Sequence, residues 1–345
     1  MIYVKKIYRN KLLAFFILSI LVIIVAVILF FYRNSNSNFI EQKWYETPKI
    51  NREEFLNETL LKSFGEKPRI NKPVGFLVYQ KENIYTYRNP LEEEVPVILL
   101  SNEKKFDEIK KKSNLKVIIA LHQTNKTGGE EPCGKSNENN PNMFYGKELN
   151  ERGYIVFCPT LSFTGARQRE NQWNTKKFYQ KYPNWSAFGK DVSEISWFID
   201  SLEVSGLDTS NIAIIGHSQG GLYALFAAAL DNRIDTVIAN AGFLNFKHDH
   251  NPERWSRQEW YKALPVVPNN WTLEEVVAAI APRNVLLNNY LQDKILISTY
   301  PYNEVKTLMT FFPTINWAFF SGEHDFPSEV KDFSFSWLLK KMPIK

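Results

Sequence analysis

One pentapeptide of the chain has the residue types and spacing of a serine nucleophile. Residues 216–220 read Gly-His-Ser-Gln-Gly, and the pattern G-x-S-x-G places a serine on a sharp turn between a strand and a helix. The Ile/Ala segment at 212–215 is typical of a buried strand, and the small and apolar residues of 219–230 favour a helix. We therefore predict that Ser218 is the nucleophile of an acyl-transfer enzyme, in preference to a glycine-rich turn with a surface serine.

A serine hydroxyl needs a neighbouring base to take its proton, and His324 is the histidine whose position suits that role. It follows a strand expected at 315–320 and precedes the last expected helix. The carboxyl ends of parallel strands share one edge of a sheet. The loop that carries His324 should therefore open over the same edge as Ser218.

The other four histidines fit other roles. His217 lies inside the turn, where its side chain should point away from the serine, and His122 ends the first parallel strand. His248 and His250 lie in a loop, and two possible ligands without a third give little support for a metal site. We expect neither a metal nor a cofactor.

Asp293 is the preferred third member of a catalytic triad, in which an acid orients the imidazole and stabilises its charged form. It follows a strand expected at 284–287 and gives the chain order Ser, Asp, His that accompanies this kind of turn. Asp249 is a rival in the loop after the preceding strand. Asp325 is a weaker candidate, because it adjoins His324 and adjacent side chains seldom face each other.

Two backbone N–H groups should form the oxyanion hole. One belongs to Gln219, the residue after the nucleophile. The other should come from the loop that follows a strand expected at 116–121, at either Gln123 or Thr124.

The elements that must position these residues alternate between strand and helix from residue 115 onward. Strands are expected at 116–121, 154–158, 212–215, 236–240, 284–287 and 315–320. Helices are expected at 142–152, 187–204, 219–230, 273–280, 303–311 and 328–340. The strands are apolar almost throughout, as in parallel strands buried on both faces. A helical region and three antiparallel strands should precede them, at 44–64, 74–80, 84–88 and 95–101. The predicted fold class is α/β, with a mostly parallel central sheet flanked by helices.

With these residues in place, the chain resembles the α/β-hydrolase superfamily, and within it the dienelactone-hydrolase and acetyl-xylan-esterase-like branch. The resemblance is carried by LHQTNKTGGEEPCG (121–134), YGKELNERGYIVFCPT (145–160), the GAR within 163–170, IAIIGHSQGGLYALFAAAL (212–230), IAPRNVLLNNYLQD (280–293) and GEHDFP (322–327). It implies the fold of that superfamily and favours Asp293 over Asp249 as the acid. The chain departs from the pattern at Cys158, where a small residue is usual, and before Asp293, where a glycine is often found.

A long apolar segment at 12–32 indicates a membrane anchor. Its 21 residues contain one conspicuously polar side chain, Ser19, and a helix of that length spans about 31 Å, enough for a hydrocarbon core of about 30 Å. No small-residue cleavage pattern follows, which argues against a signal peptide. Four basic residues precede the segment, so the N-terminus should be cytoplasmic and the catalytic domain extracytoplasmic. The expected organisation is a basic tail (1–11), the anchor, a polar tether (33–43) and one α/β-hydrolase domain (44–345).

Charge and cysteine content exclude some partners. The formal charge is +5, but four of the basic residues precede the anchor, which leaves 38 basic against 37 acidic residues. A nearly neutral domain gives no support for nucleic-acid binding. Cys133 and Cys158 show neither metal-type spacing nor a disulfide framework. They could pair in an oxidising compartment, but two unpaired thiols are the preferred expectation.

The sequence predicts a serine hydrolase that cleaves a carboxylic ester through an acyl-enzyme, and its partners should be a small ester substrate and a membrane. Trp255 and Trp260, with Tyr261 and Trp271, lie where a pocket wall could form. Aromatic side chains there could stack on a sugar, or could pack as core. A peptidase of prolyl-oligopeptidase type and a non-catalytic binding protein are the alternatives.

Overall fold

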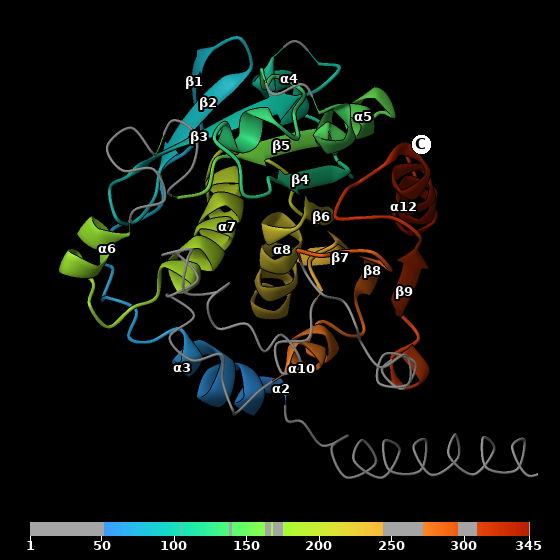
Figure 1. Ribbon diagram of the computed structural model, residues 1–345. Helices are drawn as coiled ribbons and strands as arrows, with labels where there is room; N and C mark the ends of the chain where they lie inside the picture. Colours follow the sequence, from blue (N-terminus) through green and yellow to red (C-terminus); the bar gives the residue numbers. More distant parts are fainter. Residues whose placement is uncertain are drawn as a thin grey trace, which may run out of the picture. The chain divides into compact units, whose positions relative to one another are not determined.

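A nine-stranded sheet forms the centre of the part of the chain that the structure describes (Figure 1). The structure is a computed structural model that describes residues 52–103, 105–137, 140–162, 167, 175–243, 272–295 and 309–344. The strands are β1 (Val78–Lys81), β2 (Ile84–Arg88), β3 (Glu94–Leu100), β4 (Val117–Leu121), β5 (Ile155–Pro159), β6 (Ile212–His217), β7 (Ile234–Asn240), β8 (Asn284–Tyr290) and β9 (Ile315–Phe320). Their order across the sheet is β1-β2-β3-β5-β4-β6-β7-β8-β9.

The two parts of the sheet differ in strand direction, as the sequence predicts. β1, β2 and β3 are antiparallel to their neighbours, and β3 pairs antiparallel with β5. From β5 to β9 every pairing is parallel. The chain passes from β4 to one side for β5 and then to the other side for β6. Loops after β4 and β6 therefore diverge at the point where α/β sheets form their sites.

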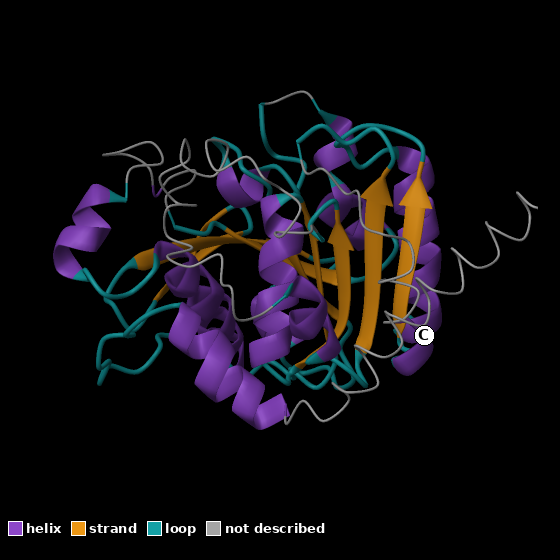
Figure 2. Cartoon of the chain, turned by 60° about the horizontal axis from the view of Figure 1, so that its bottom comes forward, coloured by secondary structure: helices purple, strands orange, loops and turns teal. Residues whose placement is uncertain are grey.

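Helices cover both faces of the sheet (Figure 2). On one face lie α7 (Ala187–Val204) and α8 (Gln219–Leu230), which contact each other, while α10 (Leu273–Ala278) packs against α8. The opposite face holds α5 (Tyr145–Glu151) and α12 (Ser328–Lys341), whose apolar side chains form one cluster with those of the central strands. β4 and β6 are buried along their whole length, which explains why their sequences are continuously apolar.

Shorter helices connect these layers. They are α2 (Arg52–Glu54), η1 (Phe55–Leu60), α3 (Leu61–Ser63), α4 (Phe106–Ile109), η2 (Gly128–Glu130), η3 (Pro141–Met143) and α6 (Lys176–Lys181). The first three form the helical region expected before Gly65, where φ is +83°. α4 lies between β3 and β4, and its Ile109 is fully buried. α6 is not predicted by the sequence analysis.

Cys133 and Cys158 form a disulfide, so the expectation of two free thiols is wrong. Cys158 lies in β5, and Cys133 lies in the loop that follows β4 and η2. Parallel pairing of β4 with β5 brings that loop back over β5, and the two Cα atoms are 6.3 Å apart. The bond therefore ties the loop after β4 to the sheet. Spacing along the chain could not reveal it, because the contact depends on strand order.

Several expectations fall outside the described residues. The expected anchor at 12–32 and most of the expected helix at 303–311 lie there. Within the described part, no helix combines the length and the apolar character needed to cross a membrane.

Candidate active site

Ser218 stands on the turn between β6 and α8 in a conformation that non-glycine residues rarely adopt, with φ of 54° and ψ of −119°. Its backbone N–H donates to the carbonyl of Asn240 at the end of β7, at 2.8 Å. Glycines make the turn possible. A Cβ on Gly216 would lie 2.2 Å from the backbone of Gly220, and a Cβ on Gly220 would lie 2.3 Å from the carbonyl oxygen of Leu121. The start of α8 therefore sits directly on the end of β4.

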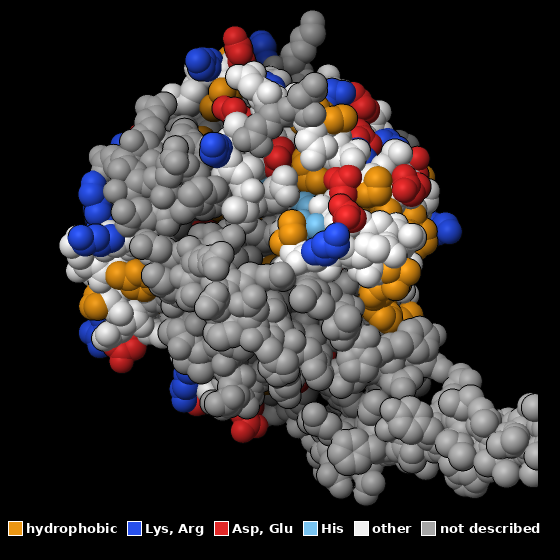
Figure 3. Space-filling view, viewed as in Figure 1, with side chains coloured by type: hydrophobic (Ala, Val, Ile, Leu, Met, Phe, Trp, Pro, Cys, Tyr) orange, Lys and Arg blue, Asp and Glu red, His pale blue; other side chains and the backbone are white. Residues whose placement is uncertain are grey.

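Asp293 and His324 face each other at the same edge of the sheet. His324 Nδ1 is 2.7 Å from Asp293 Oδ2, and 8% and 2% of the two side chains are exposed. β8 continues three residues beyond the expected end at 287, so Asp293 comes almost directly after the strand. Of the three described histidines only His324 is not fully buried, and one area of histidine surface is visible in Figure 3.

His217 lies beneath His324, with ring centroids 4.7 Å apart. Because the His217 ring belongs to the residue before Ser218, this contact places His324 against the turn that carries the serine. Burial lowers the pKa of His217 well below its usual value, and the neighbouring His324 lowers it further. His217 is therefore neutral at physiological pH, and it adds no positive charge below the imidazole of His324.

The two segments expected to form the oxyanion hole lie side by side. Gln219 is the first residue of α8, where a backbone N–H has no acceptor within the helix. The Thr124 hydroxyl donates to Gln219 Oε1 at 2.8 Å. The Gln123 side chain turns away and donates to Glu131 at 3.0 Å. The geometry thus brings Thr124 and Gln219 together, and it places both beside Ser218.

His122 fixes the start of the same loop. Its Nδ1 is 2.7 Å from the carbonyl oxygen of Gln123, and its Nε2 accepts from the backbone N–H of Leu161 at 3.1 Å. A backbone carbonyl only accepts, so Nδ1 carries the proton and Nε2 is the acceptor. Burial lowers the pKa of His122 to about 4. Neutral His122 therefore links the loop after β4 to the loop after β5.

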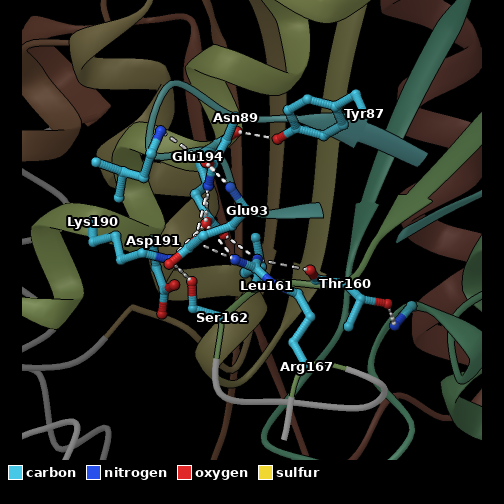
Figure 4. Close-up of polar contacts among 12 residues, drawn as sticks. Tyr87, Asn89, Glu93, Thr160, Leu161, Ser162, Arg167, Lys190, Asp191 and Glu194 are labelled. Carbon is cyan, nitrogen blue, oxygen red and sulfur yellow. Dashed lines mark hydrogen bonds and ion pairs between the residues drawn. The ribbon is translucent and has the colours of Figure 1, made fainter. Parts of the chain in front are cut away.

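A buried cluster of charges anchors the loop after β5, and sequence reasoning assigned it no role (Figure 4). Arg167 binds Glu194 through both terminal nitrogens, at 2.5 and 2.7 Å, and Glu93 at 2.8 Å. Lys190 binds Glu194 at 2.7 Å, one helical turn along α7. Glu194 is 1% exposed, and the two cations hold its pKa well below the usual range despite its burial. The available signal was the run Lys-Asp-x-x-Glu at 190–194, which places three charged side chains near the start of a helix that is largely buried.

A chain of hydrogen bonds runs from this cluster toward the oxyanion loop. Asp191 Oδ2 accepts from the Tyr223 hydroxyl at 3.0 Å, and that hydroxyl accepts from Gln219 Nε2 at 3.2 Å. Burial raises the pKa of Asp191 to about 7, and the charge of Glu194 adds to this effect. Asp191 is therefore the carboxyl group of this region that titrates near neutrality.

Other residues considered from sequence lie elsewhere. Trp255, Trp260, Tyr261 and Trp271 are outside the described residues, as are Asp249, His248 and His250. Among the described aromatic residues, Trp185 lies between α6 and α7, is 2% exposed, and packs against Phe178, Tyr182 and Trp197 as core. Over the described ranges, no three His, Cys, Asp or Glu side chains group as a metal site requires.

Comparisons with known proteins identify the fold that carries this site. No family model and no curated protein matches the sequence. Solved structures do match, among them a glucuronoyl esterase from Solibacter usitatus, at 15% identity and a TM-score of 0.54 over 85% of this chain and 92% of that one. The chain has the α/β-hydrolase fold.

Two further α/β hydrolases show the same likeness. A putative acetyl xylan esterase from Bacteroides fragilis has 14% identity and a TM-score of 0.59, over 83% of this chain and 86% of that one. A carbohydrate esterase family 15 glucuronoyl esterase from Caldicellulosiruptor kristjansonii has 18% identity and a TM-score of 0.54, over 84% and 85% of the two chains. The expected resemblance to acetyl-xylan-esterase-like α/β hydrolases is confirmed at the level of the fold.

Proposed function

We propose that this α/β hydrolase is a serine esterase whose catalytic triad is Ser218, Asp293 and His324. The observation that carries the proposal is the Asp293–His324 pair, 2.7 Å apart, at the sheet edge where Ser218 stands on a strained turn. Positive φ at a non-glycine residue is a cost that proteins retain mainly at functional sites. A hydrolase with this arrangement performs acyl transfer to water.

The same catalytic groups act in both halves of the reaction, the acylation of Ser218 and the hydrolysis of the acyl-enzyme. Ser218 Oγ attacks the ester carbonyl and gives its proton to His324 Nε2, since Nδ1 is engaged with Asp293. The backbone N–H of Gln219, with one from Gln123 or Thr124, stabilises the oxyanion. The alcohol leaves with the proton from His324. Water then attacks the acyl-enzyme by the same route, and it releases the acid and restores Ser218.

The substrate class that fits best is a carbohydrate ester. Support comes from the similar structures, which are two glucuronoyl esterases and a putative acetyl xylan esterase. Initial rates on acetylated xylo-oligosaccharides, methyl glucuronate esters, p-nitrophenyl acetate and an aminoacyl amide would rank the classes. We expect turnover of the sugar esters to exceed turnover of the amide. Faster cleavage of the amide would favour a peptidase instead.

The triad is tested by substituting its members. S218A should lower kcat/KM for p-nitrophenyl acetate by about 10⁴-fold or more and abolish labelling by a fluorophosphonate, with an unchanged circular dichroism spectrum. Residual activity close to that of the wild type would refute the nucleophile.

The acid is tested by comparing three aspartates. D293N should lower kcat by about 10⁴-fold, because an amide cannot stabilise the imidazolium. D325N is the matched control, since Asp325 adjoins the same histidine but its carboxylate accepts from Asn142 at 2.5 Å. D249N tests the rival. A large loss of kcat in D249N, with D293N still active, would identify Asp249 as the acid of the triad.

We also propose that residues 12–32 anchor the chain in a membrane with the catalytic domain on the extracytoplasmic side. The apolar segment and its basic flank support this, and so does the Cys133–Cys158 disulfide, because such bonds persist in oxidising compartments. The full chain should stay with membranes after an alkaline carbonate wash, and protease added to intact cells should degrade it. Recovery in the cytoplasmic fraction would contradict the proposal.

A further inference from the structure

Asn240, the last residue of β7, contacts the segments that carry all three catalytic groups. Its backbone carbonyl accepts from the N–H of Ser218 at 2.8 Å. Its side-chain Nδ2 donates to the carbonyl of Asp325, the residue after His324, at 2.9 Å. Its Oδ1 accepts from the hydroxyl of Tyr290, the last residue of β8, at 2.7 Å. Asn240 is fully buried.

The orientation of the Asn240 amide follows from its partners. A backbone carbonyl can only accept, so the group that faces Asp325 must be the NH₂. The second hydrogen of that NH₂ points at His217 Nδ1, 2.7 Å away. Nδ1 is therefore the acceptor and the His217 ring carries its proton on Nε2. This agrees with the lowered pKa of His217.

We propose that Asn240 is a positioning residue that keeps the serine turn, the histidine loop and the acid strand in register for catalysis. The proposal rests on the serine-esterase function given above. The loop after β9 and the turn after β6 come from different parts of the chain, and the pairing of strands alone does not set their separation. Asn240 joins them through one side chain and its own carbonyl.

The neutral amide suits this role for an electrostatic reason. A charged side chain between His217 and Asp325 would change the electrostatic potential at the His324 imidazole, because charges interact strongly in a buried region. An amide supplies two donors and an acceptor without net charge. All three are used, which fixes the side chain in one orientation.

The test compares Asn240 with a matched residue on the neighbouring strand. Asn288 in β8 is also fully buried, but its Nδ2 donates to Ser334 in α12 at 2.8 Å, away from the triad. N240A should lower kcat about 10²-fold with KM changed less than about 3-fold, since a displacement of about 1 Å at the reacting groups has that effect. N288A should lower the thermal midpoint comparably and leave kcat within about 3-fold.

A second variant separates positioning from stability. In N240D a protonated carboxyl keeps one donor for Asp325, whereas the ionised form has none. N240D should therefore regain part of the kcat at low pH and lose it as pH rises, which adds an ionisation absent from the wild-type profile. This readout remains if N240A proves too unstable to purify.

The outcomes separate the two proposals. Suppose that the wild type is active but N240A loses no more kcat than N288A, or N240D keeps the wild-type pH profile. Either result overturns the role of Asn240 and leaves the esterase function standing. A wild type that neither hydrolyses esters nor reacts with a fluorophosphonate at Ser218 overturns the esterase function and this role together.

Discussion

The two sides of the active-site edge are held by different kinds of interaction. On the β5 side, the loop that contains Arg167 is fixed by a buried ion pair with Glu194 and by a second, partly exposed ion pair with Glu93. On the β7–β9 side, the loop that contains His324 is fixed from below by neutral groups, the amide of Asn240 and the imidazole of His217.

The difference shows how a fold can anchor a loop without disturbing a catalytic base. Ion pairs bind a loop firmly, but they need complete pairing, because a lone buried charge is costly. Each neutral hydrogen bond contributes less to stability. However, neutral groups add no charge beside the His324 imidazole, so the charge of Asp293 dominates the electrostatic potential there. The charged anchor is thus placed on the side away from the histidine.

The largest expected effect comes from the charged side. E194Q removes the carboxylate that Arg167 and Lys190 share, so the unfolding free energy should fall by about 3–5 kcal/mol. E203Q is the control, because Glu203 pairs with Arg233 near the surface, at 41% and 29% side-chain exposure, and should cost less than about 1 kcal/mol. Urea denaturation measures both. Equal losses of unfolding free energy in E194Q and E203Q would show that burial does not determine how much these ion pairs contribute to stability.

A smaller effect is expected on the neutral side. Y290F leaves Asn240 Oδ1 without the hydroxyl of Tyr290, and should lower the unfolding free energy by about 1–3 kcal/mol. Y154F removes a comparable buried bond, from Tyr154 to the carbonyl of Met342, far along the chain from the triad segments. Both should lose similar stability, but only Y290F should lower kcat. A loss of kcat in both variants would mean that general stability, and not the anchor, controls activity.

The smallest expected effect is on the pH dependence of the unfolding free energy. Burial raises the pKa of Asp191 from the usual 3.8 of an aspartate to about 7. The folded state therefore keeps a proton that the unfolded chain releases, and stability falls as pH rises from about 4 to about 7. D191N cannot ionise, so its stability relative to the wild type should rise between pH 5 and pH 8.

Asp208 supplies the control for this pH effect. Hydrogen bonds from Ser210, and then from Asn114, lower the pKa of Asp208. The stability that Asp208 contributes is present above pH 4 and lost only at lower pH. D208N should therefore show a pH dependence parallel to the wild type between pH 5 and pH 8. A D191N curve that is also parallel would show that Asp191 does not titrate in this range.

Sequence patterns predicted what is local. The serine turn around Ser218 could be predicted because its strand, glycines and helix are contiguous in the sequence. The helices at 187–204 and 219–230 have the expected bounds. The pairing of Asp293 with His324 follows from the order of parallel strands. Asp293 lies closer to its strand than expected, because β8 continues through Asn288 and Asn289, whose side-chain NH₂ groups donate to Ser334 and to the carbonyl of Phe243.

What the sequence could not predict depends on contacts between distant segments. The Cys133–Cys158 bond needs the position of β5 beside β4. The role of Arg167 needs the approach of α7 to the turn after β2. A lone arginine in a polar loop carries no local signal of burial, and a lone asparagine at the end of a strand carries none of its partners.

The backbone at Ser218 bears on how the activity is maintained over generations. A residue with a side chain at this φ costs on the order of 1–3 kcal/mol, a substantial share of the 5–15 kcal/mol that typically separates folded from unfolded chains. Replacement by glycine would relieve the strain, so a chain released from selection for hydrolysis would gain stability by discarding its nucleophile. A serine with this strained backbone is therefore consistent with the proposed role of Ser218 as the nucleophile.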